Sequence, residues 1–524
     1  MTQDTSAPAA ATAPQTPARA SKNPPVRGGA TRTARYAGLP RIPWWPALLA
    51  AVLTCATAFW GLTGPQMWFD EAATISAVTR PFGSLLRLLQ DVDAVHGLYY
   101  LLMYPWVALF GTSELAMRAP SAIALTLAAP LLARLAMACA RRHVPERMVL
   151  TGVAAAVLFA LFPGITWSGQ DARGYAMAVL ATVAALWCFE RFRDHRGTWP
   201  LIGFALCQAA AIGFSMYAAI VVVLYLVRAL TWGRAAFLRV LVASAVTGVL
   251  CLPLILLAAS QSGQVSWIDL SLPQVLERMA LRTFFVSPVN RGGEMGALSL
   301  DIAPWLGLLV LVVLALGLLR GPGRRHLLWL ICYVALPLLI VIAAQLAGEQ
   351  FFQERYFTFS APMLVLALSL ALAAIRWRPV IVVLTAAIAA LSVPSLLGQN
   401  TDDAKSGDNY RTASQIVNQT DTVIFMERSD RGIFNAYPPD HEIADPMLAE
   451  DRISADNLWG LSEPGYTAWQ IDTVGPTSVV SNKNNGYHDA VLSHLGKNGC
   501  TVTQTSMETR FRITVLDCPD PASP

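Results

Sequence analysis

Charged residues are scarce in this chain, and one kind is missing from most of it. Only 14% of the 524 residues are charged while 55% are hydrophobic, which excludes a large soluble protein and is typical of a protein that crosses a membrane many times. No lysine occurs between Lys22 and Lys405, so every cation of the apolar part is an arginine. A GC-rich genome explains this bias most simply, although arginine also suits the recognition of phosphate.

Three further absences narrow the class of protein. Residues 1–43 are rich in Ala, Pro, Thr and Arg without an apolar core, so we expect a disordered cytoplasmic tail and no cleavable signal peptide. No Cys/His spacing indicates a zinc site. No internal repeat is found, whereas many transporters are built from repeated halves.

Residues 44–399 contain eleven apolar runs that approach the length needed to cross a bilayer. These predicted spans are 45–64, 119–140, 148–166, 175–191, 199–215, 216–232, 237–259, 302–319, 327–347, 356–375 and 380–397. The run 98–111 is too short to cross, and we expect an interfacial helix there. The arginine-rich loops then share the side of the basic N-terminus, so the positive-inside rule predicts a cytoplasmic N-terminus.

The tail, residues 400–524, has a different composition. It carries 18 of the 34 acidic side chains but only 9 of the 38 basic ones. The patterns predict helices at 409–419 and 487–499 and strands at 422–428, 477–481, 500–505 and 510–518. Cys500 and Cys518 fall on two candidate neighbouring strands, and an extracytoplasmic location would favour a disulfide between them. The predicted fold class is therefore an all-α polytopic membrane domain of about eleven transmembrane helices, followed by a small extracytoplasmic α/β domain.

The most informative charges stand just past the first apolar run. Asp70 and Glu71 lie in the sequence WFDEAATIS, at the outer end of the first predicted span. Charges at the rim of a membrane are functional candidates because holding them there is unfavourable. Other polar residues gather on the same predicted face, namely Asp91, Asp93, His96, Asp171, Arg173, Glu354, Arg355 and Tyr356.

A single site at the boundary of water and lipid suits transfer from a membrane-bound donor to an acceptor outside. Because ATP and sugar nucleotides are absent outside a bacterial plasma membrane, donors there are typically lipid-linked, with a polyprenyl tail in the bilayer and a phosphate at headgroup height. Moving a sugar off such a phosphate needs a carboxylate base for the acceptor hydroxyl and cations or a metal for the leaving phosphate. The predicted outer face carries both kinds of group.

Four motifs carry a resemblance to a known family. DEAATIS, HGLYYLLMYPWVALFGTSELAMRAPSAI, WSGQDARGYAMAVL and ERYFTFSAPML follow one another between Trp68 and Pro362. In order and spacing this set resembles the C-superfamily (GT-C) glycosyltransferases, which use polyprenyl-phosphate sugars. It is most similar to the bacterial members related to protein O-mannosyltransferases and to the lipid A aminoarabinose transferase.

The resemblance implies catalytic roles for three carboxylates. Asp70 would be the catalytic base, Glu71 would support it, and Asp171 would be the second acidic residue, which assists the acceptor or a metal. The resemblance also implies a site for the donor phosphate, made by Arg355, Arg173 and Tyr356.

An acceptor or metal region is implied around Asp93 and His96. His96 matches the histidine of an HPP-type motif, although Gly97 and Leu98 stand where the family commonly has prolines. A divalent cation, Mg or Mn, could join the donor phosphate to Asp70, Asp171 or His96, but the sequence does not require one, and the alternative is no cofactor at all.

Simpler structural roles compete with some of these assignments. Asp171 and Arg173 fit an internal ion pair, and Arg355 fits a side chain that snorkels to the interface. Glu114 and Arg118 are four residues apart, and we expect a structural pair on one helix face.

We therefore predict an inverting glycosyltransferase on the outer face of the bacterial plasma membrane. It would move mannose, another hexose or arabinose from a polyprenyl-phosphate donor to an envelope glycan, a glycolipid or a protein, with membrane lipids but no nucleic acid as partners. The alternatives are a lipid-linked-oligosaccharide flippase or transporter, an envelope polymerase or ligase with a lipid diphosphate donor, and an inactive scaffold. A transporter predicts charges at span centres, whereas these acidic residues lie at outer ends, which favours the enzyme.

Overall fold

The computed structural model describes residues 39–265, 267–287, 293–405, 409–462, 473, 475–483, 485–507 and 510–519. Pro40–Pro524 form one compact unit. The predicted cytoplasmic tail, residues 1–43, lies almost wholly outside the described residues, and so do short stretches of the region after residue 400.

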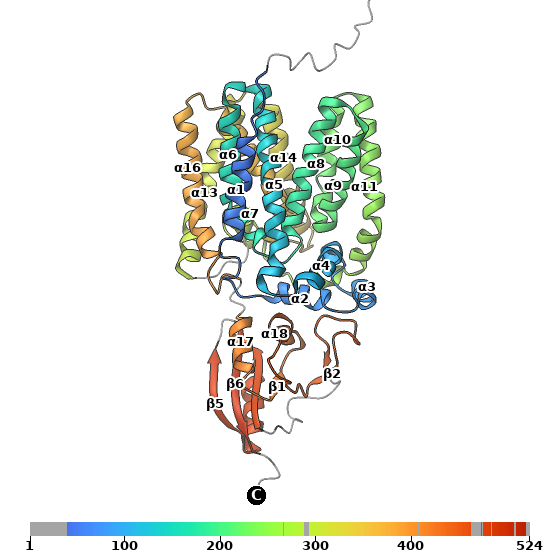
Figure 1. Ribbon diagram of the computed structural model, residues 1–524, viewed down its shortest axis with the longest axis vertical. Helices are drawn as coiled ribbons and strands as arrows, with labels where there is room; N and C mark the ends of the chain where they lie inside the picture. Colours follow the sequence, from blue (N-terminus) through green and yellow to red (C-terminus); the bar gives the residue numbers. More distant parts are fainter. Residues whose placement is uncertain are drawn as a thin grey trace, which may run out of the picture. The chain divides into compact units, whose positions relative to one another are not determined.

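Helices make up the region before residue 400. The α-helices are α1 (Trp45–Phe59), α2 (Phe69–Val78), α3 (Phe82–Asp91), α4 (Gly97–Phe110), α5 (Glu114–His143), α6 (Met148–Leu161), α7 (Pro163–Gly169), α8 (Tyr175–His195), α9 (Thr198–Phe214), α10 (Val222–Leu230), α11 (Arg234–Ser260), α12 (Leu272–Phe285), α13 (Gly293–Arg320), α14 (Arg324–Leu346), α15 (Ala361–Ala373) and α16 (Arg378–Gly398). Short 3-10 helices join them at η2 (Ala94–His96), η3 (Pro145–Arg147), η4 (Met216–Ala219), η5 (Ser262–Val265) and η6 (Glu354–Ser360). Figure 1 shows the long helices side by side in a bundle, with α2, α3 and α4 at one end of it.

All eleven predicted runs fall on helices, but fewer than eleven reach the length of a span. Within the described residues, seven helices are long and apolar enough to cross a membrane, or up to eight if the bent pair Pro145–Leu161 and Pro163–Gly169 is one span. The helices Trp45–Phe59, Thr198–Phe214 and Met216–Leu230 are shorter. The eleven predicted runs therefore correspond, within the described residues, to the seven long helices, the bent pair and these three shorter apolar helices.

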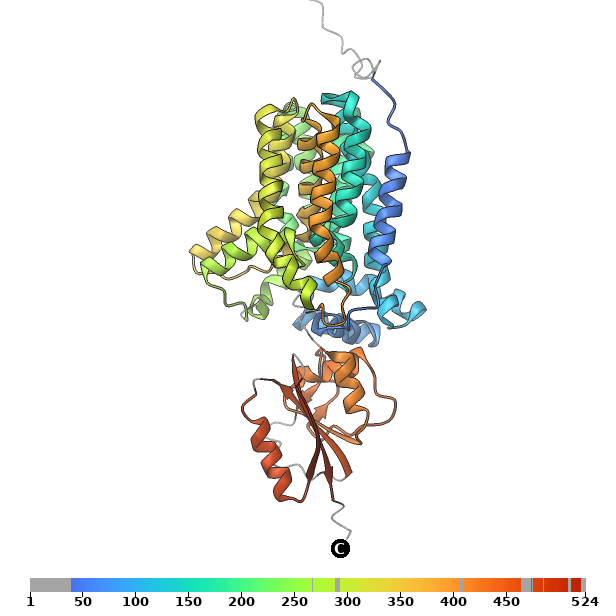
Figure 2. The same ribbon diagram turned by 90° about the vertical axis from the view of Figure 1, so that its left-hand side faces the viewer.

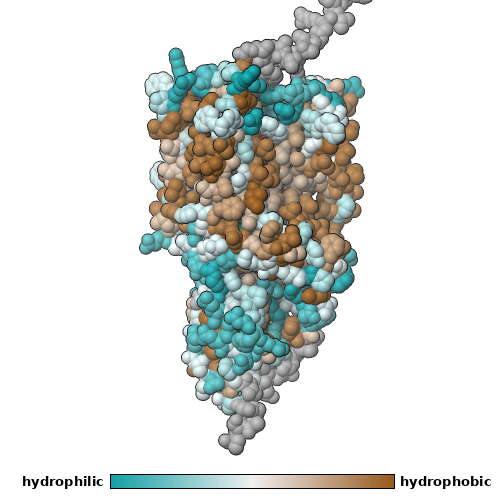
Figure 3. All heavy atoms as spheres, in the orientation of Figure 1, coloured by the Kyte–Doolittle hydropathy of each residue, from teal (hydrophilic) through white to brown (hydrophobic). Residues whose placement is uncertain are grey.

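The lateral surface of the helix bundle, which would contact lipid, carries exposed apolar side chains. Val249 of α11 is 71% exposed and Leu311 of α13 is 64% exposed. On the face of the molecule that Figure 3 draws, hydrophobic side chains cover the bundle and hydrophilic ones lie toward both of its ends. Together with the long apolar helices, this surface shows a multi-pass membrane protein.

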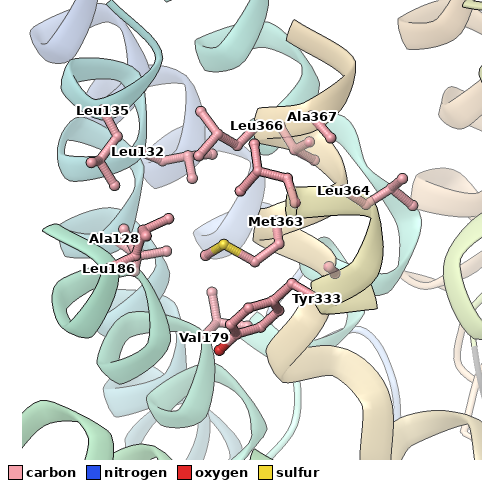
Figure 4. Packing of buried hydrophobic residues seen from close by; sticks show 14 of the residues in the cluster. Ala128, Leu132, Leu135, Val179, Leu186, Tyr333, Met363, Leu364, Leu366 and Ala367 are labelled. Atoms are coloured by element: carbon pink, nitrogen blue, oxygen red, sulfur yellow. The ribbon is translucent and has the colours of Figure 1, made fainter. Parts of the chain in front are cut away.

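Small and branched apolar side chains fill the core between the helices. Figure 4 shows its centre, with Ala128, Leu132 and Leu135 of α5, Val179 and Leu186 of α8, Tyr333 of α14, and Met363, Leu364, Leu366 and Ala367 of α15. Where α13 meets α15 the backbones approach closely, because a Cβ on Gly317 would lie 2.6 Å from the Cβ of Ala371. Such contacts between small residues are common in membrane helix packing.

Helices α2, α3 and α4 form a layer at the end of the bundle, next to the tail (Figures 1 and 2). The predicted interfacial helix is α4, which has 14 residues. Helix α3 is amphipathic: Leu85 and Leu88 are buried, while Phe82 and Leu86 are 47% and 43% exposed. This layer positions the polar residues described below.

The tail is a small α/β domain, as predicted. Its elements are α17 (Tyr410–Val417), β1 (Thr422–Phe425), η7 (Arg428–Arg431), α18 (Gly432–Ala436), β2 (Leu448–Glu450), β3 (Leu461–Ser462), β4 (Gly475–Asn482), α19 (His488–Lys497), β5 (Thr501–Met507) and β6 (Phe511–Cys518). Four strands form a sheet in the order β1-β4-β6-β5, in which β1 runs parallel to β4 and the other neighbours are antiparallel. The predicted disulfide between Cys500 and Cys518 is present.

Asp430 in η7 is a buried carboxyl group in the tail. Its side chain is 1% exposed, and among the described residues neither carboxylate oxygen has a hydrogen-bond partner. Burial, and after it the charge of Glu427, raises the pKa of Asp430 to about 7. The native state therefore binds a proton between about pH 4 and pH 7 that the unfolded chain does not, so its stability falls as the pH rises through this range.

We expect Asp430→Asn to stabilise the tail at neutral and basic pH, because the amide carries no charge to bury. At pH 8 the free energy of unfolding should rise by roughly 2–4 kcal/mol, and at pH 4 the difference should vanish. Hydrogen exchange of the β1 and α18 amides in the full-length protein, compared at the two pH values, measures this. Equal protection of variant and parent at pH 8 would contradict the assignment.

Candidate active site

Helix α2 places Asp70 and Glu71 in its first turn. Negative side chains are favourable there because the N-terminal end of a helix carries a partial positive charge. Successive residues of a helix point about 100° apart, so the two carboxylates face different neighbours. Asp70 faces Arg173 and Arg355, whereas Glu71 faces Arg118 and Lys405.

The carboxylate of Asp70 lies between two guanidinium groups. Arg173 Nη2 is 3.5 Å from Asp70 Oδ1, and Arg355 Nη2 is 3.5 Å from Asp70 Oδ2. Burial raises the pKa of Asp70, but the positive charges of Arg355 and Arg173 outweigh it and bring the pKa below its usual value. The side chain is 14% exposed. Asp70 is therefore an ionised carboxylate that is still accessible from outside the fold.

Arg173 contacts Asp70 and is also linked, through the hydroxyl group of Tyr100, to a second carboxylate, that of Asp93. Its Nη1 donates to Tyr100 Oη at 2.9 Å, and Tyr100 Oη donates to Asp93 Oδ2 at 2.6 Å. Arg173 Nη1 also lies 3.9 Å from Asp93 Oδ2. The ring of His96 lies 6.1 Å from that of Tyr100, and burial, followed by the charge of Arg173, lowers the pKa of His96 to about 4. The imidazole is neutral at pH 7 as a result.

Glu71 forms a fully buried ion pair with Arg118 of α5. Arg118 Nε and Nη2 donate to the two carboxylate oxygens at 2.8 and 2.7 Å, and both side chains are 0% exposed. The remaining guanidinium N–H groups donate to the carbonyl oxygens of Leu62, Pro65 and Gln66. Every donor of Arg118 is thus used. Burial raises the pKa of Glu71, but Arg118 and Lys405 bring it down to about 2.

Lys405, the first residue of its kind after Lys22, completes this second group of charges. Its Nζ donates to Glu71 Oε1 at 2.7 Å, to the carbonyl oxygen of Gln170 at 2.5 Å and to Asp171 Oδ1 at 3.1 Å. Burial and Arg118 lower the pKa of Lys405, while Glu71 and Asp171 act in the opposite direction. No motif in the sequence assigns Lys405 a role, although its isolation, as the first lysine after Lys22, is a signal that the sequence does carry.

Only one of the two carboxylate oxygens of Asp171 has hydrogen-bond partners among the described residues. Besides Lys405, Oδ1 accepts a hydrogen bond from Trp68 Nε1 at 2.9 Å, whereas Oδ2 has no partner among the described residues. Burial raises the pKa of Asp171 above its usual value, although Lys405 opposes the shift. Asp171, the predicted second acidic residue, is therefore joined to Glu71 through Lys405, a partner that its sequence motif does not predict.

Aromatic rings surround Arg355. Its guanidinium lies 5.4 Å from the ring centre of Trp68 and 5.7 Å from that of Tyr356, and the Tyr356 ring stacks on Tyr217 at 5.4 Å. Trp68 packs in one buried cluster with Trp167 and Tyr175, against which Tyr356 also lies. Arg355 is 14% exposed and contacts Asp70, so it is part of the same site.

Two of the simpler structural expectations are wrong. Asp171 and Arg173 do not pair with each other, because Asp171 bonds Lys405 and Arg173 contacts Asp70. Glu114 and Arg118 are not a helix pair either: Arg118 points inward to Glu71, and Glu114 accepts hydrogen bonds from Arg411 and Tyr437 of the tail. Spacing along one helix cannot reveal such partners from other segments.

The predicted metal ligands do not assemble into a metal site. Among the described residues no group of three or more His, Cys, Asp and Glu side chains is placed to hold an ion. Asp70 is flanked by two guanidinium groups and Asp171 is bonded to an ammonium group, so positive charge already occupies the positions next to both carboxylates. The residues present do not fit a divalent cation.

Arg118 and Glu114 provide a matched test of this arrangement. Arg118→Met should lower the free energy of unfolding by about 3–5 kcal/mol, because it leaves Glu71 buried without its main partner. Glu114→Gln removes a partly exposed pair and should cost less than about 1 kcal/mol. Thermal unfolding of the two variants in detergent compares them. Similar losses would instead support the pairing of these residues along one helix.

Comparison with known proteins gives the fold but little sequence similarity. No protein-family model and no curated protein matches the chain. The aminoarabinose transferase ArnT from Cupriavidus metallidurans in the apo state superposes with a TM-score of 0.54 and 12% identity over 90% of this chain and 97% of that one. ArnT bound to undecaprenyl phosphate superposes with a TM-score of 0.51 and 12% identity over 90% and 98%. The chain therefore has the fold of the GT-C glycosyltransferases, as its motifs predict.

Proposed function

We propose that this protein is a glycosyltransferase that moves a sugar from a polyprenyl-phosphate donor to an acceptor hydroxyl at a bacterial plasma membrane. The observation that carries the proposal is the position of Asp70, a partly exposed carboxylate between Arg173 and Arg355. It belongs to α2, which lies at one end of the bundle in Figure 1. The shared fold supports it, because one ArnT structure is bound to undecaprenyl phosphate.

Asp70 is the proposed general base. As the acceptor oxygen attacks the anomeric carbon, its proton passes to the Asp70 carboxylate. The bond between the anomeric carbon and the phosphate oxygen breaks, and the polyprenyl phosphate leaves with the bonding electron pair. Attack opposite to the leaving group inverts the configuration at the anomeric carbon.

Arg173 and Arg355 are the proposed ligands of the donor phosphate. Unlike Arg118, they are not saturated: the Nε of each has no hydrogen-bond partner among the described residues, and their contacts with Asp70 are 3.5 Å long. Arginine binds phosphate through charge and paired N–H donors. The leaving phosphate would be stabilised by these same groups.

The same two arginines link donor binding to base strength. Before the donor binds, their charges keep the pKa of Asp70 low, which makes the carboxylate a weak base. A phosphate that draws the guanidinium groups to itself removes this effect and raises the pKa of Asp70. The base then becomes stronger when a donor is in place, which limits unproductive proton transfer without one.

The orientation in the membrane is part of the proposal. The arginine-rich loops favour a cytoplasmic N-terminus, and the disulfide of the tail is typical of an oxidising compartment outside the plasma membrane. We propose residues 1–43 as a cytoplasmic tail, 44–399 as the catalytic membrane domain and 400–524 as the extracytoplasmic domain. Mannose, another hexose and arabinose are all retained as donor sugars, with an envelope glycan, a glycolipid or a protein as acceptor.

Asp70→Asn tests the catalytic step. The amide keeps the shape but is not a base, so we expect transfer in native membranes to fall by about 100-fold or more. The assay supplies undecaprenyl-phosphate mannose, other hexoses and arabinose, each radiolabelled, and measures label in the acceptor fraction.

Asp91→Asn is the matched control, because Asp91 is an exposed carboxylate at the end of α3. Its transfer should equal that of the parent. An Asp70→Asn protein as active as the parent would refute the assignment of Asp70. Mass spectrometry of envelope glycans and lipid-linked sugars from cells without the protein would then identify donor and acceptor independently.

Chelation tests whether a divalent cation takes part. Because positive side chains occupy the positions beside Asp70 and Asp171, we expect EDTA to leave the transfer rate unchanged in washed membranes. The control is the same membrane sample with Mg²⁺ restored. Loss of transfer with EDTA and its recovery with Mg²⁺ or Mn²⁺ would show that a metal is required.

A further inference from the structure

The segment that joins α16 to the tail is fixed against α7 and the residue after it, and it also lies against the loop before α2. Gln399 Nε2 donates to the carbonyl oxygen of Pro163 at 3.1 Å, and Gln170 Nε2 donates to Asn400 Oδ1 at 2.7 Å. Two glycines make the approach possible, because a Cβ on Gly61 or Gly64 would lie 2.2 or 2.4 Å from an oxygen of Asn400. This connector, residues 399–405, therefore has a defined path at the site.

The connector delivers Lys405 to the carboxylates beside Asp70. The ammonium group is 4% exposed and has three acceptors, which equals its number of N–H donors. Glu71 and Asp171 both bond to this one nitrogen, so they are close enough to repel each other strongly. Lys405 offsets that repulsion because it bonds both carboxylates, whereas Arg118 forms its ion pair with Glu71.

Asp171 is the link from Lys405 to the proposed base. The residue two positions later is Arg173, which contacts Asp70 directly. Ser121 Oγ donates to the carbonyl oxygen of Asp171 at 2.7 Å and holds this short loop on α5. A shift of the Asp171 side chain would move the loop and therefore the guanidinium group that faces Asp70.

Further contacts tie the tail to α2, the helix that carries Asp70. Ser76 Oγ donates to the carbonyl oxygen of Leu458 at 2.6 Å, and Gln66 Nε2 donates to Asp402 Oδ2 at 2.9 Å. The rings of Phe69 and Trp459 lie 5.0 Å apart. The tail thus contacts α2 near both of its ends.

We propose that Lys405 is a positioning residue of the active centre, which makes the tail's connector an obligatory part of the catalytic unit. Lys405 holds Glu71 and Asp171 in their ionised, fixed arrangement and leaves Asp70 as the carboxylate available for proton transfer. The inference rests on the proposed sugar transfer. The connector supplies the ammonium group that bonds Glu71 and Asp171, and residues 44–399 alone do not contain it.

The test compares Lys405→Met with Lys497→Met in the full-length protein in membranes, using the donor panel described above. Lys497 is an exposed lysine of α19, so its loss should leave transfer unchanged. Lys405→Met should lower kcat about 100-fold, the size expected from a small misplacement of reacting groups. Lys405→Arg, which keeps the charge, should recover part of that loss.

The pH profile separates positioning from folding. Without the ammonium charge, Asp171 and Glu71 take up protons at higher pH, so the acidic limb of kcat/KM for Lys405→Met should shift upward by about one pH unit. A loss of folded protein alone would lower the whole profile and leave its midpoint in place. Transfer and a pH profile equal to those of the parent would overturn the proposal.

A second comparison remains decisive even if Lys405→Met does not fold. Glu71→Gln together with Lys405→Met removes one charge of each sign. The net charge of the buried cluster of Glu71, Asp171, Arg118 and Lys405 therefore stays at zero. The proposal predicts that this double variant transfers at least tenfold less sugar than Glu71→Gln alone, because Asp171 has lost its ammonium partner. Equal transfer by the two would overturn it. A parent protein that transfers no sugar from any donor would instead refute the proposed function, and the role of Lys405 with it.

Discussion

The ion pair between Glu71 and Arg118 is the interaction on which the rest of the site depends. Both groups are fully buried, and the guanidinium also bonds three carbonyl oxygens of the loop before α2. A buried charge without its partner is strongly unfavourable, so this contact fixes where α2 begins relative to α5. Once α2 is fixed, so is the position in its first turn of Asp70, the residue before Glu71 in the chain.

Charge balance explains why so many ionisable groups coexist at the end of an apolar bundle. Glu71 and Asp171 are balanced by Arg118 and Lys405, while Asp70 and Asp93 are balanced by Arg173 and Arg355. The first group is buried, and every N–H donor of Arg118 and Lys405 in it is used, which suits a structural role. In the second group Asp70, Asp93 and Arg355 are 14–17% exposed, and the Nε of Arg173 and of Arg355 has no hydrogen-bond partner among the described residues, which suits the binding of an anion.

The sequence predicts the fold better than it predicts the contacts of the site. Apolar runs locate every long helix, and alternation with turn residues locates the four strands of the larger sheet of the tail but not the short strands β2 and β3, because both patterns are local. The motifs also bring Asp70, Arg173 and Arg355 to one site. Local patterns do not reveal that Arg118 turns inward or that Lys405 enters from the connector. These partners are distant in sequence from Glu71, so the folded positions of the segments, and not the spacing of residues along one helix, decide which charges pair.

The most direct test of the account is a structure of the protein with undecaprenyl phosphate bound in a lipid nanodisc. The account predicts that the phosphate lies within hydrogen-bond distance of Arg173 and Arg355, with both guanidinium groups farther from Asp70 than the present 3.5 Å. The Asp70 carboxylate should then face the phosphate from the side open to water. A phosphate bound elsewhere, with both arginines still in contact with Asp70, would contradict the account.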